Sequence, residues 1–202
     1  MHPNKAFQWV DTQAMLRFVA EHSFAHVFSA SDAGLFAVHV PVVVKDGRVW
    51  FHVARRNRIA DHLDGHPVLI SVLGRHAYHS ANWYASEDQV STWHYEAVEI
   101  EGVARRVSED ELVSLIDQLS DTMEQRYSPE QPWTRATMTP GKFDAMTKAI
   151  VGFEVKPTEI RGTRKFNQSK SGADLEATIA GQRGAGREDI VAAIEELRPR
   201  GE

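Results

Sequence analysis

Two short turns near the N-terminus limit the topology of this chain more than any other feature. Three runs rich in Val, Phe and Ala, at 25–30, 35–44 and 49–54, are separated only by Ser-Asp-Ala-Gly and Lys-Asp-Gly. Both linkers are hairpin signals, and both are too short for a crossover between parallel strands. The sequence therefore predicts an antiparallel meander and argues against a doubly wound parallel sheet.

The rest of the chain adds strands first and helices later. We expect further strands at 68–73, 92–107 and 149–156, the last one closed by Pro157, and helices at 11–22, 57–63, 109–127, 142–148, 173–180 and 188–197. The helix from 109 is the best defined, because Ser108 and Glu111 have the spacing of a capping box. About six strands with peripheral helices predict a small, closed or partly closed antiparallel β-barrel of the α+β class.

We divide the chain into a barrel domain at 1–160 and a C-terminal extension at 161–202. The extension begins as a basic loop and continues as two helices around a glycine-rich segment. Its glycines and charges offer little to bury, so it is expected to be partly mobile.

Composition narrows the classes of function. The 202 residues are 42% hydrophobic and 25% charged, with no cysteine and a formal net charge of −5. Thiolate chemistry is excluded, and the net charge disfavours nucleic acid as a partner. We find no apolar run long enough to span a membrane and no secretory signal, so the expected location is cytoplasmic. His-Glu-x-x-His and glycine-rich phosphate loops are missing, so no metal site or ordinary nucleotide fold is predicted.

An aromatic stretch at 74–95 has the composition of a binding site. It combines large rings with His76, His79 and His94. Rings of this kind either belong to strands packed on the core or line a cleft. The polar residues interleaved with them favour the cleft.

A second candidate site follows the strand at 49–54. Arg55 and Arg56 lie where a strand ends and a helix is expected to begin, and such a position suits a bound phosphate. The alternative is that both arginines are solvated surface residues. The basic segment 162–170 is either a surface loop or a cover for a bound anion.

Taken in order, five blocks of the sequence resemble the PaiB-type family of FMN-binding negative transcriptional regulators. The blocks are His39-Val40-Pro41, His52-Val53-Ala54-Arg55-Arg56-Asn57, 74–84, Thr92-Trp93-His94-Tyr95 and 150–155. The resemblance implies a split β-barrel related to pyridoxamine-phosphate oxidase barrels, a homodimer, and FMN held between its subunits. The sequence departs from the family pattern at Arg58, His94 and Asn167–Ser169, and typical members have Asn where His94 stands.

Carried onto this chain, the resemblance implies a set of cofactor-binding residues. They are His39, Val40, Pro41, His52 and Val53 along the flavin, Arg55, Arg56 and Asn57 at its phosphate, Tyr78, Trp83 and Trp93 at the ring or the dimer seam, and Lys165 and Gln168 from the C-terminal segment.

Three functions remain open at this point. The first is an FMN-binding homodimer that acts as a flavin-dependent oxidoreductase on an unknown small molecule, or as a flavin-linked regulator, with its catalytic residues unassigned. The second is a PaiB-like transcriptional regulator on DNA, for which the basic residues near 161–170 are the only physical support. The third is a haem-binding split barrel, suggested by the histidine surplus.

Overall fold

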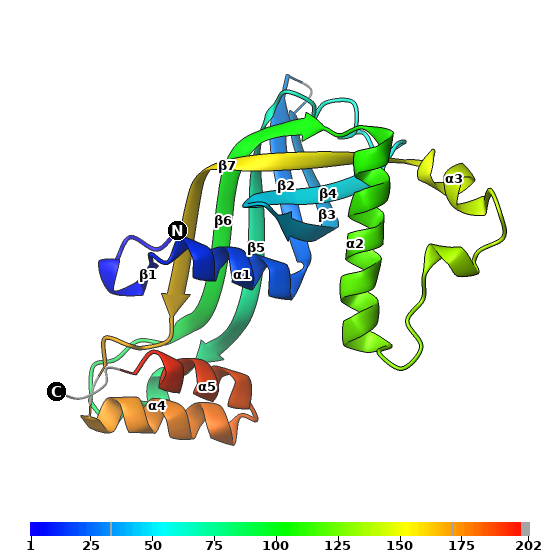
Figure 1. The fold of residues 1–202 in the computed structure, drawn as a ribbon. Coiled ribbons are helices and arrows are strands. Elements are labelled where there is room, and N and C mark those ends of the chain that lie inside the picture. The colour runs from blue at the N-terminus through cyan, green and yellow to red at the C-terminus, as the bar shows by residue number, and fades with distance from the viewer. Residues whose placement is uncertain (33, 171, 199–202) are drawn as a thin grey trace. The chain divides into compact units, whose positions relative to one another are not determined.

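A ring of seven strands dominates the computed structural model, which describes residues 1–32, 34–170 and 172–198. The strand order is β1-β7-β4-β3-β2-β5-β6, and pairing of β7 with β6 closes the antiparallel sheet (Figure 1). The strands are β1 (Gln8–Trp9), β2 (Phe24–Ser31), β3 (Gly34–Lys45), β4 (Arg48–Ala54), β5 (Pro67–His79), β6 (Thr92–Arg106) and β7 (Ile150–Lys165). The predicted barrel with peripheral helices is confirmed.

Across the described ranges, five α-helices and three 3-10 turns complete the fold. They are η1 (Lys5–Phe7), α1 (Thr12–His22), η2 (Ala81–Trp83), α2 (Glu109–Tyr127), η3 (Arg135–Thr137), α3 (Lys142–Thr147), α4 (Gly172–Gly184) and α5 (Glu188–Glu196). Residues 109–127 form a helix as predicted, and the Ser108–Glu111 capping box is present. None of the helices within the described residues is long and apolar enough to cross a membrane.

The chain forms two compact units. One consists of Thr12–Val72 and Glu99–Ile160 and is called the meander unit here, because it contains β2, β3 and β4. The other consists of Met1–Asp11, Leu73–Val98 and Arg161–Glu202 and is called the terminal unit. The expected domain boundary at residue 160 stays a prediction.

The meander unit is built as the short turns require. β2 pairs antiparallel with β3, and β3 with β4. The β3–β4 turn places Asp46 and Gly47 at φ values of 51° and 70°, which an Asp-Gly hairpin turn accommodates. Helix α2 stands beside β3 and β4, where its Leu112 and Leu115 pack on Val43 (Figure 1).

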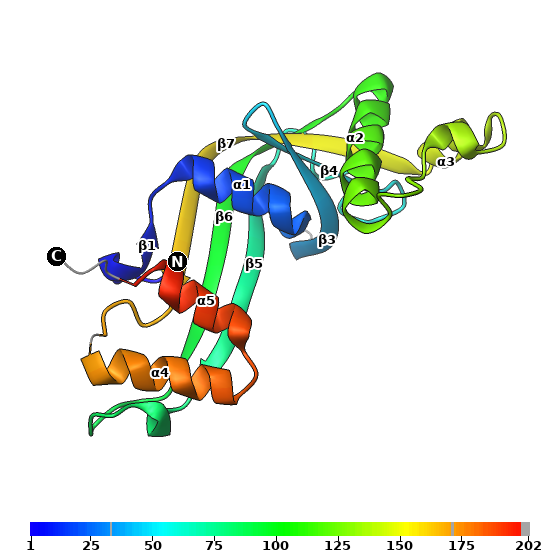
Figure 2. The ribbon, with the colours of Figure 1, turned by 60° about the horizontal axis from the view of Figure 1, so that its bottom comes forward.

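The terminal unit has its own core. Helices α4 and α5 lie beside β5 in both views (Figures 1 and 2). The buried cluster consists of Ala77, Phe166, Leu175, Ile179, Ile190, Val191, Ala193 and Ile194. The expectation that 161–202 offers little to bury was therefore wrong. Apolar residues at helical spacing on α4 and α5 pack together with Ala77 of β5. Whether the segment is mobile stays a prediction.

Five local predictions need correction. Residues 57–63 form consecutive turns and no regular helix, in which Asn57 Oδ1 accepts from the backbone N–H of Ile59. The loop expected from residue 161 is strand up to residue 165, and β5 is longer than predicted. Pro157 does not end β7, and it lies between the stretch paired with β4 and the stretch paired with β1. Helix α4 continues to Gly184.

Candidate functional site

The outer face of the β2–β3 pair carries two of the predicted flavin residues. His39 is the cross-strand partner of His26, and the two rings meet edge to face at 4.7 Å. Pro41 is half-buried and pairs with Phe24, which is 54% exposed. This face offers a planar ligand two imidazoles and an apolar floor.

Val40 and Val53 lie on the opposite face of the sheet. Their exposed fractions are 2% and 3%, so their side chains belong to the core of the meander unit. Side chains alternate along a strand, so these two valines support His39 and His52 from beneath. Only their backbone could reach a ligand on the outer face.

His52 is a half-buried residue with an unsatisfied nitrogen. It stands opposite Gly152 of β7, and its Nδ1 is buried without a hydrogen-bond partner among the described residues. Burial lowers the pKa of His52, so the imidazole is neutral at pH 7. A buried polar atom of this kind needs a partner that the protein itself does not supply.

Arg55 is tied to the backbone at the end of β4. Its Nε donates to the carbonyl of Lys148 at 2.7 Å and its Nη2 donates to the carbonyl of Ile150 at 3.1 Å. The Arg55 N–H also donates to the carbonyl of Ala149. The guanidinium is thus held in one orientation.

Arg56 and Asn57 extend the basic corner. Arg56 is exposed, and Asn57 uses its Oδ1 in the turn while its amide donors have no hydrogen-bond partner among the described residues. The helix N-terminus that was expected to add a positive field is absent here, because 57–63 consists of turns. Arg55 also lines a cleft of about 230 Å³ whose other charged members are Lys148, Glu109, Asp110 and Asp144. Those carboxylates disfavour an anion inside that cleft, so a phosphate at this corner would have to be held by Arg56 and Asn57.

A larger apolar cavity of about 500 Å³ lies in the meander unit. It is lined by Phe28, Ser29, Ala30, Leu35, Phe36, Pro67, Val68, Leu69, Glu101, Gly102, Val103 and Thr158. Phe28 stacks on His26 with ring centroids 6.3 Å apart, so the cavity continues the outer face. Leu35 and Val103 are 81% and 51% exposed. An apolar surface of this kind is typical of an interface.

The remaining predicted residues lie in the terminal unit. Tyr78 and Trp93 are each 51% exposed and meet edge to face at 6.0 Å, with the ring of His76 6.4 Å from Trp93. These three form an exposed aromatic face of β5 and β6.

Trp83, Lys165 and Gln168 are engaged inside the same unit. The Trp83 ring packs directly on Gly181, where a Cβ would lie 2.5 Å from it. The Nζ of Lys165 donates to Thr92 Oγ1 at 2.7 Å. Gln168 Oε1 accepts from the Phe166 N–H, so all three residues have structural contacts.

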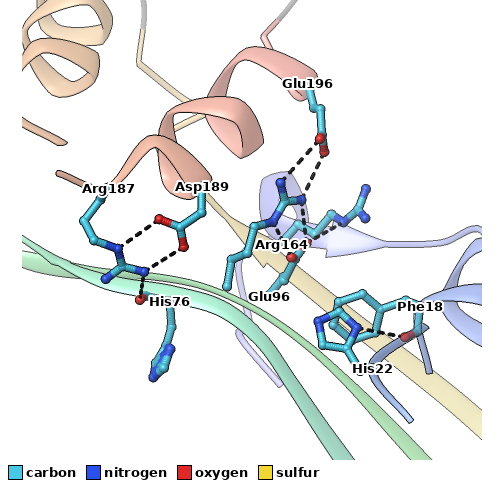
Figure 3. Close-up of polar contacts among 9 residues, drawn as sticks. Phe18, His22, His76, Glu96, Arg164, Arg187, Asp189 and Glu196 are labelled. Atoms are coloured by element: carbon cyan, nitrogen blue, oxygen red, sulfur yellow. Dashed lines mark hydrogen bonds and ion pairs between the residues drawn. The ribbon is translucent and has the colours of Figure 1, made fainter. Parts of the chain in front are cut away.

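Two polar features of the terminal unit were not identified as structural from the sequence. Glu96 is buried between Arg75 and Arg164, and Glu196 of α5 completes the cluster (Figure 3). His79 and His94 are fully buried and stacked on one another at 4.9 Å. Period-two alternation along β6 could have located Glu96 and His94, because the buried residues of that strand recur at every second position. In β5 the buried positions shift phase between Val72 and Ala77, so alternation does not locate His79.

Within residues 1–32, 34–170 and 172–198, no group of three or more His, Cys, Asp or Glu side chains is placed to hold a metal ion.

Comparison with known proteins decides the family. Residues 1–159 match the family model described as "Putative FMN-binding domain". The chain belongs to this family. FMN is the cofactor that this membership indicates, and the span of the match includes every predicted residue of the meander unit.

Several known proteins are similar to this chain in sequence or in fold. Protease synthase and sporulation protein PAI 2 of Bacillus subtilis is 28% identical over 179 residues, which are 86% of this chain and 85% of that protein. An FAD and haem binding protein from Mycobacterium smegmatis has a similar fold, with a TM-score of 0.62, 16% identity, and coverage of 86% of this chain and 80% of that one. A flavocytochrome from Azotobacter vinelandii has a TM-score of 0.56, 12% identity, and coverage of 85% and 73%. The fold is thus the split barrel of flavin-binding proteins.

Proposed function

We propose that this protein is a homodimeric flavoprotein that holds FMN on the outer face of β3 and β4. The observation that carries the proposal is the family match over residues 1–159, within which His39, Pro41 and His52 share one outward face. FMN, when bound, supplies hydride or single-electron transfer. The chain supplies binding, orientation and exclusion of water.

The donor set of the meander unit fits FMN. Arg56 and the amide of Asn57 are free to donate to phosphate oxygens, and Arg55 adds a fixed positive charge. The Nδ1 of His52 has no partner among the described residues, but it is buried, so it could bond a heterocycle only after the groups that cover it move. His39 and Pro41 offer a flat, partly apolar surface to a ring, so each part of the cofactor has a complementary group.

A second copy of the chain is the partner that we propose for the apolar part of this face. Phe24, Phe28, Leu35 and Val103 are 40% exposed or more, and the cavity of about 500 Å³ lies among three of them. Covering this surface removes apolar area from water, which drives association.

One spectrum tests the proposal most directly. The purified protein should show flavin absorption and release FMN on denaturation, or should take up FMN in a fluorescence-quenching titration. Light scattering should give twice the mass of the chain. A colourless monomer that takes up no FMN would contradict both parts.

A flavin-linked regulator is a second candidate. Its support is the similarity to the Bacillus subtilis protein, whose name refers to protease synthesis and sporulation. The net charge of −5 disfavours direct contact with DNA. A mobility shift that survives moderate salt, and that changes when FMN is added, would support this role over a purely enzymatic one.

A further inference from the structure

Two neutral imidazoles are stacked inside the terminal unit without the partners that buried polar groups normally have. His79 and His94 are both 0% exposed, and their rings lie 4.9 Å apart at an angle of 21°. Neither nitrogen of His79 has a hydrogen-bond partner within the described residues, and the same holds for Nε2 of His94. The Nδ1 of His94 lies 3.5 Å from Nε2 of Gln182.

The surroundings of the pair are poor in negative charge. Aromatic rings of Trp83, Tyr84 and Phe166 meet the imidazoles at 4.6–6.1 Å. Burial lowers the pKa of His79 to about 4. Burial and repulsion from His79 and Lys165 lower the pKa of His94 to about 4, and they outweigh a hydrogen bond with Asn167 that acts in the opposite direction.

The facing groups can be named element by element. They are His79 on β5, His94 on β6, Tyr84 after η2, Lys165 and Asn167 at the end of β7, and Thr178 and Gln182 on α4. Within the described residues, neither imidazole forms a hydrogen bond or ion pair with a carboxylate. Asp174 of α4 is already engaged with residues 85 and 86.

One segment packs two aromatic rings on His79 and is fastened at separate points. Residues 80–91, called the strap here, place the Trp83 ring on Gly181 of α4. Asp174 accepts from the N–H of Ala85 at 3.0 Å, and from the N–H and Oγ of Ser86 at 2.9 and 2.7 Å. The Tyr84 hydroxyl accepts from Asn167, and Lys170 donates to Gln89. The strap is thus an ordered cover with polar anchors at its exposed edge.

We propose that the strap is an acid-released lid over the His79–His94 pair, which opens when either imidazole takes up a proton. An imidazolium in the closed site would keep at least one N–H without an acceptor and would face a second ring and Lys165 with no carboxylate to balance it. Opening hydrates the ring, so the proton is bound more tightly in the open state. Acid therefore favours opening.

The direction and size of the pH effect on strap opening follow from the linkage between protonation and opening. An exposed histidine has a pKa of about 6.5, and the closed site lowers this pKa to about 4. The open fraction is insensitive to pH above 6.5 and rises as pH falls from 6.5 towards 4. Between pH 7 and pH 5 the opening equilibrium should increase about 20-fold for each histidine that becomes exposed.

Hydrogen exchange of the full-length protein tests the proposal. The reporters are the amides of Trp83, Tyr84, Ala85 and Ser86, each of which donates a hydrogen bond in the closed strap. Their protection factors, corrected for intrinsic exchange, should fall at least 10-fold from pH 7 to pH 5. The amides of Val98 and Ile100 in β6 should not follow them.

Variants make the test specific to the buried pair. The double variant His79→Asn/His94→Asn removes both titrating groups and should make strap protection independent of pH. His76→Asn, on the exposed side of β5, should keep the wild-type response. Strap protection that is constant between pH 7 and pH 5 in the wild type, or an undiminished response in the double variant, would overturn the proposal.

A measurement on the wild type alone tests the proposal even if the variants fail to fold. In NMR titrations, the ring protons of His79 and His94 should stay in the neutral form down to the pH at which strap protection is lost. Normal titration near pH 6.5 with the strap still protected would refute the mechanism.

Discussion

The Nε of Arg75 lies 2.7 Å from Oε1 of Glu96, a side chain that is 2% exposed. Arg164 approaches the other carboxylate oxygen at 3.2 Å while its guanidinium stacks on the Trp9 ring at 3.6 Å. The Nη2 of Arg75 also pairs with Glu196 at 3.1 Å (Figure 3). Glu96 is therefore the buried centre of a charge network that links β5, β6, β7 and α5 within the terminal unit.

We expect Glu96→Gln to destabilise the protein by about 3 kcal/mol, because two half-buried guanidinium groups then face an amide that cannot balance their charge. Glu196→Gln should cost less than about 1 kcal/mol, since that side chain is half exposed. Urea denaturation followed by circular dichroism measures both values. Equal losses would mean that burial does not decide the energetics of this network.

A second prediction concerns the close contact of Trp83 with α4. Gly181→Ala places a Cβ within 2.8 Å of three atoms of the indole, so the ring must move, at a cost of about 1–3 kcal/mol. Gly184→Ala in the same helix meets open space and should be neutral or slightly stabilising. The Trp83 indole resonance should shift in the first variant and stay in place in the second.

The sequence predicts the meander and α2 well because local signals decide them. Short turns admit only antiparallel pairing, and the capping box defines the start of α2. Residues 57–63 were predicted less well, since an apolar Ile59–Leu63 pattern fits both a helix and a set of turns that bury the same side chains. The continuation of β7 past Pro157 depends on neighbouring strands that no local pattern reveals.

The candidate site is predictable as a motif and less so as geometry. The sequence places His39 and Pro41 within a strand and Arg55 just after one, but it does not reveal that Arg55 is held by two carbonyls from residues 148 and 150. Those carbonyls are more than ninety positions away in the chain. The surroundings of His94 likewise include α4, whose Gln182 lies 3.5 Å from the Nδ1 of His94 and almost ninety positions away in the chain.

The proposed dimer makes a third prediction. Leu35→Lys puts a charge at the 81% exposed edge of the apolar face and should shift the protein towards monomer, with dissociation at least 10-fold easier. Met146→Lys introduces the same charge at a 57% exposed residue of α3 and should leave the mass unchanged. Light scattering over a concentration series distinguishes them, and identical masses for both variants would argue against this face as the interface.

A fourth prediction concerns acid stability at the start of α2. The Arg105 guanidinium, and then the Ser108 N–H, lower the pKa of Glu111 to about 2. Because the folded-state pKa lies below the ordinary value, the stabilisation is present above pH 4.5 and is lost as pH falls towards 2. The side chain is 37% exposed, so screening limits the effect to about 1 kcal/mol. In urea denaturation, Glu111→Gln should lower the free energy of unfolding by about 1 kcal/mol at pH 7 and by little at pH 2.5. The control Glu109→Gln should have the wild-type free energy of unfolding at both pH values.

The last prediction separates cofactor binding from structure at the basic corner. Arg55→Ala removes two side-chain bonds to the 148–150 backbone, so it should lower stability by about 1–2 kcal/mol and also weaken FMN binding. Arg56→Ala removes an exposed guanidinium with no bond to the rest of the chain among the described residues. It should therefore weaken FMN binding about 10-fold or more while leaving the urea midpoint unchanged.

Arg17→Ala, an exposed arginine on α1, is the matched control for loss of charge and should change neither property. Titration with riboflavin, which lacks the phosphate, makes the assignment specific. If Arg56 meets the phosphate, wild type and Arg56→Ala should bind riboflavin equally well. A variant that loses affinity for FMN and riboflavin alike would place Arg56 at the ring, and unchanged FMN affinity would remove it from the site.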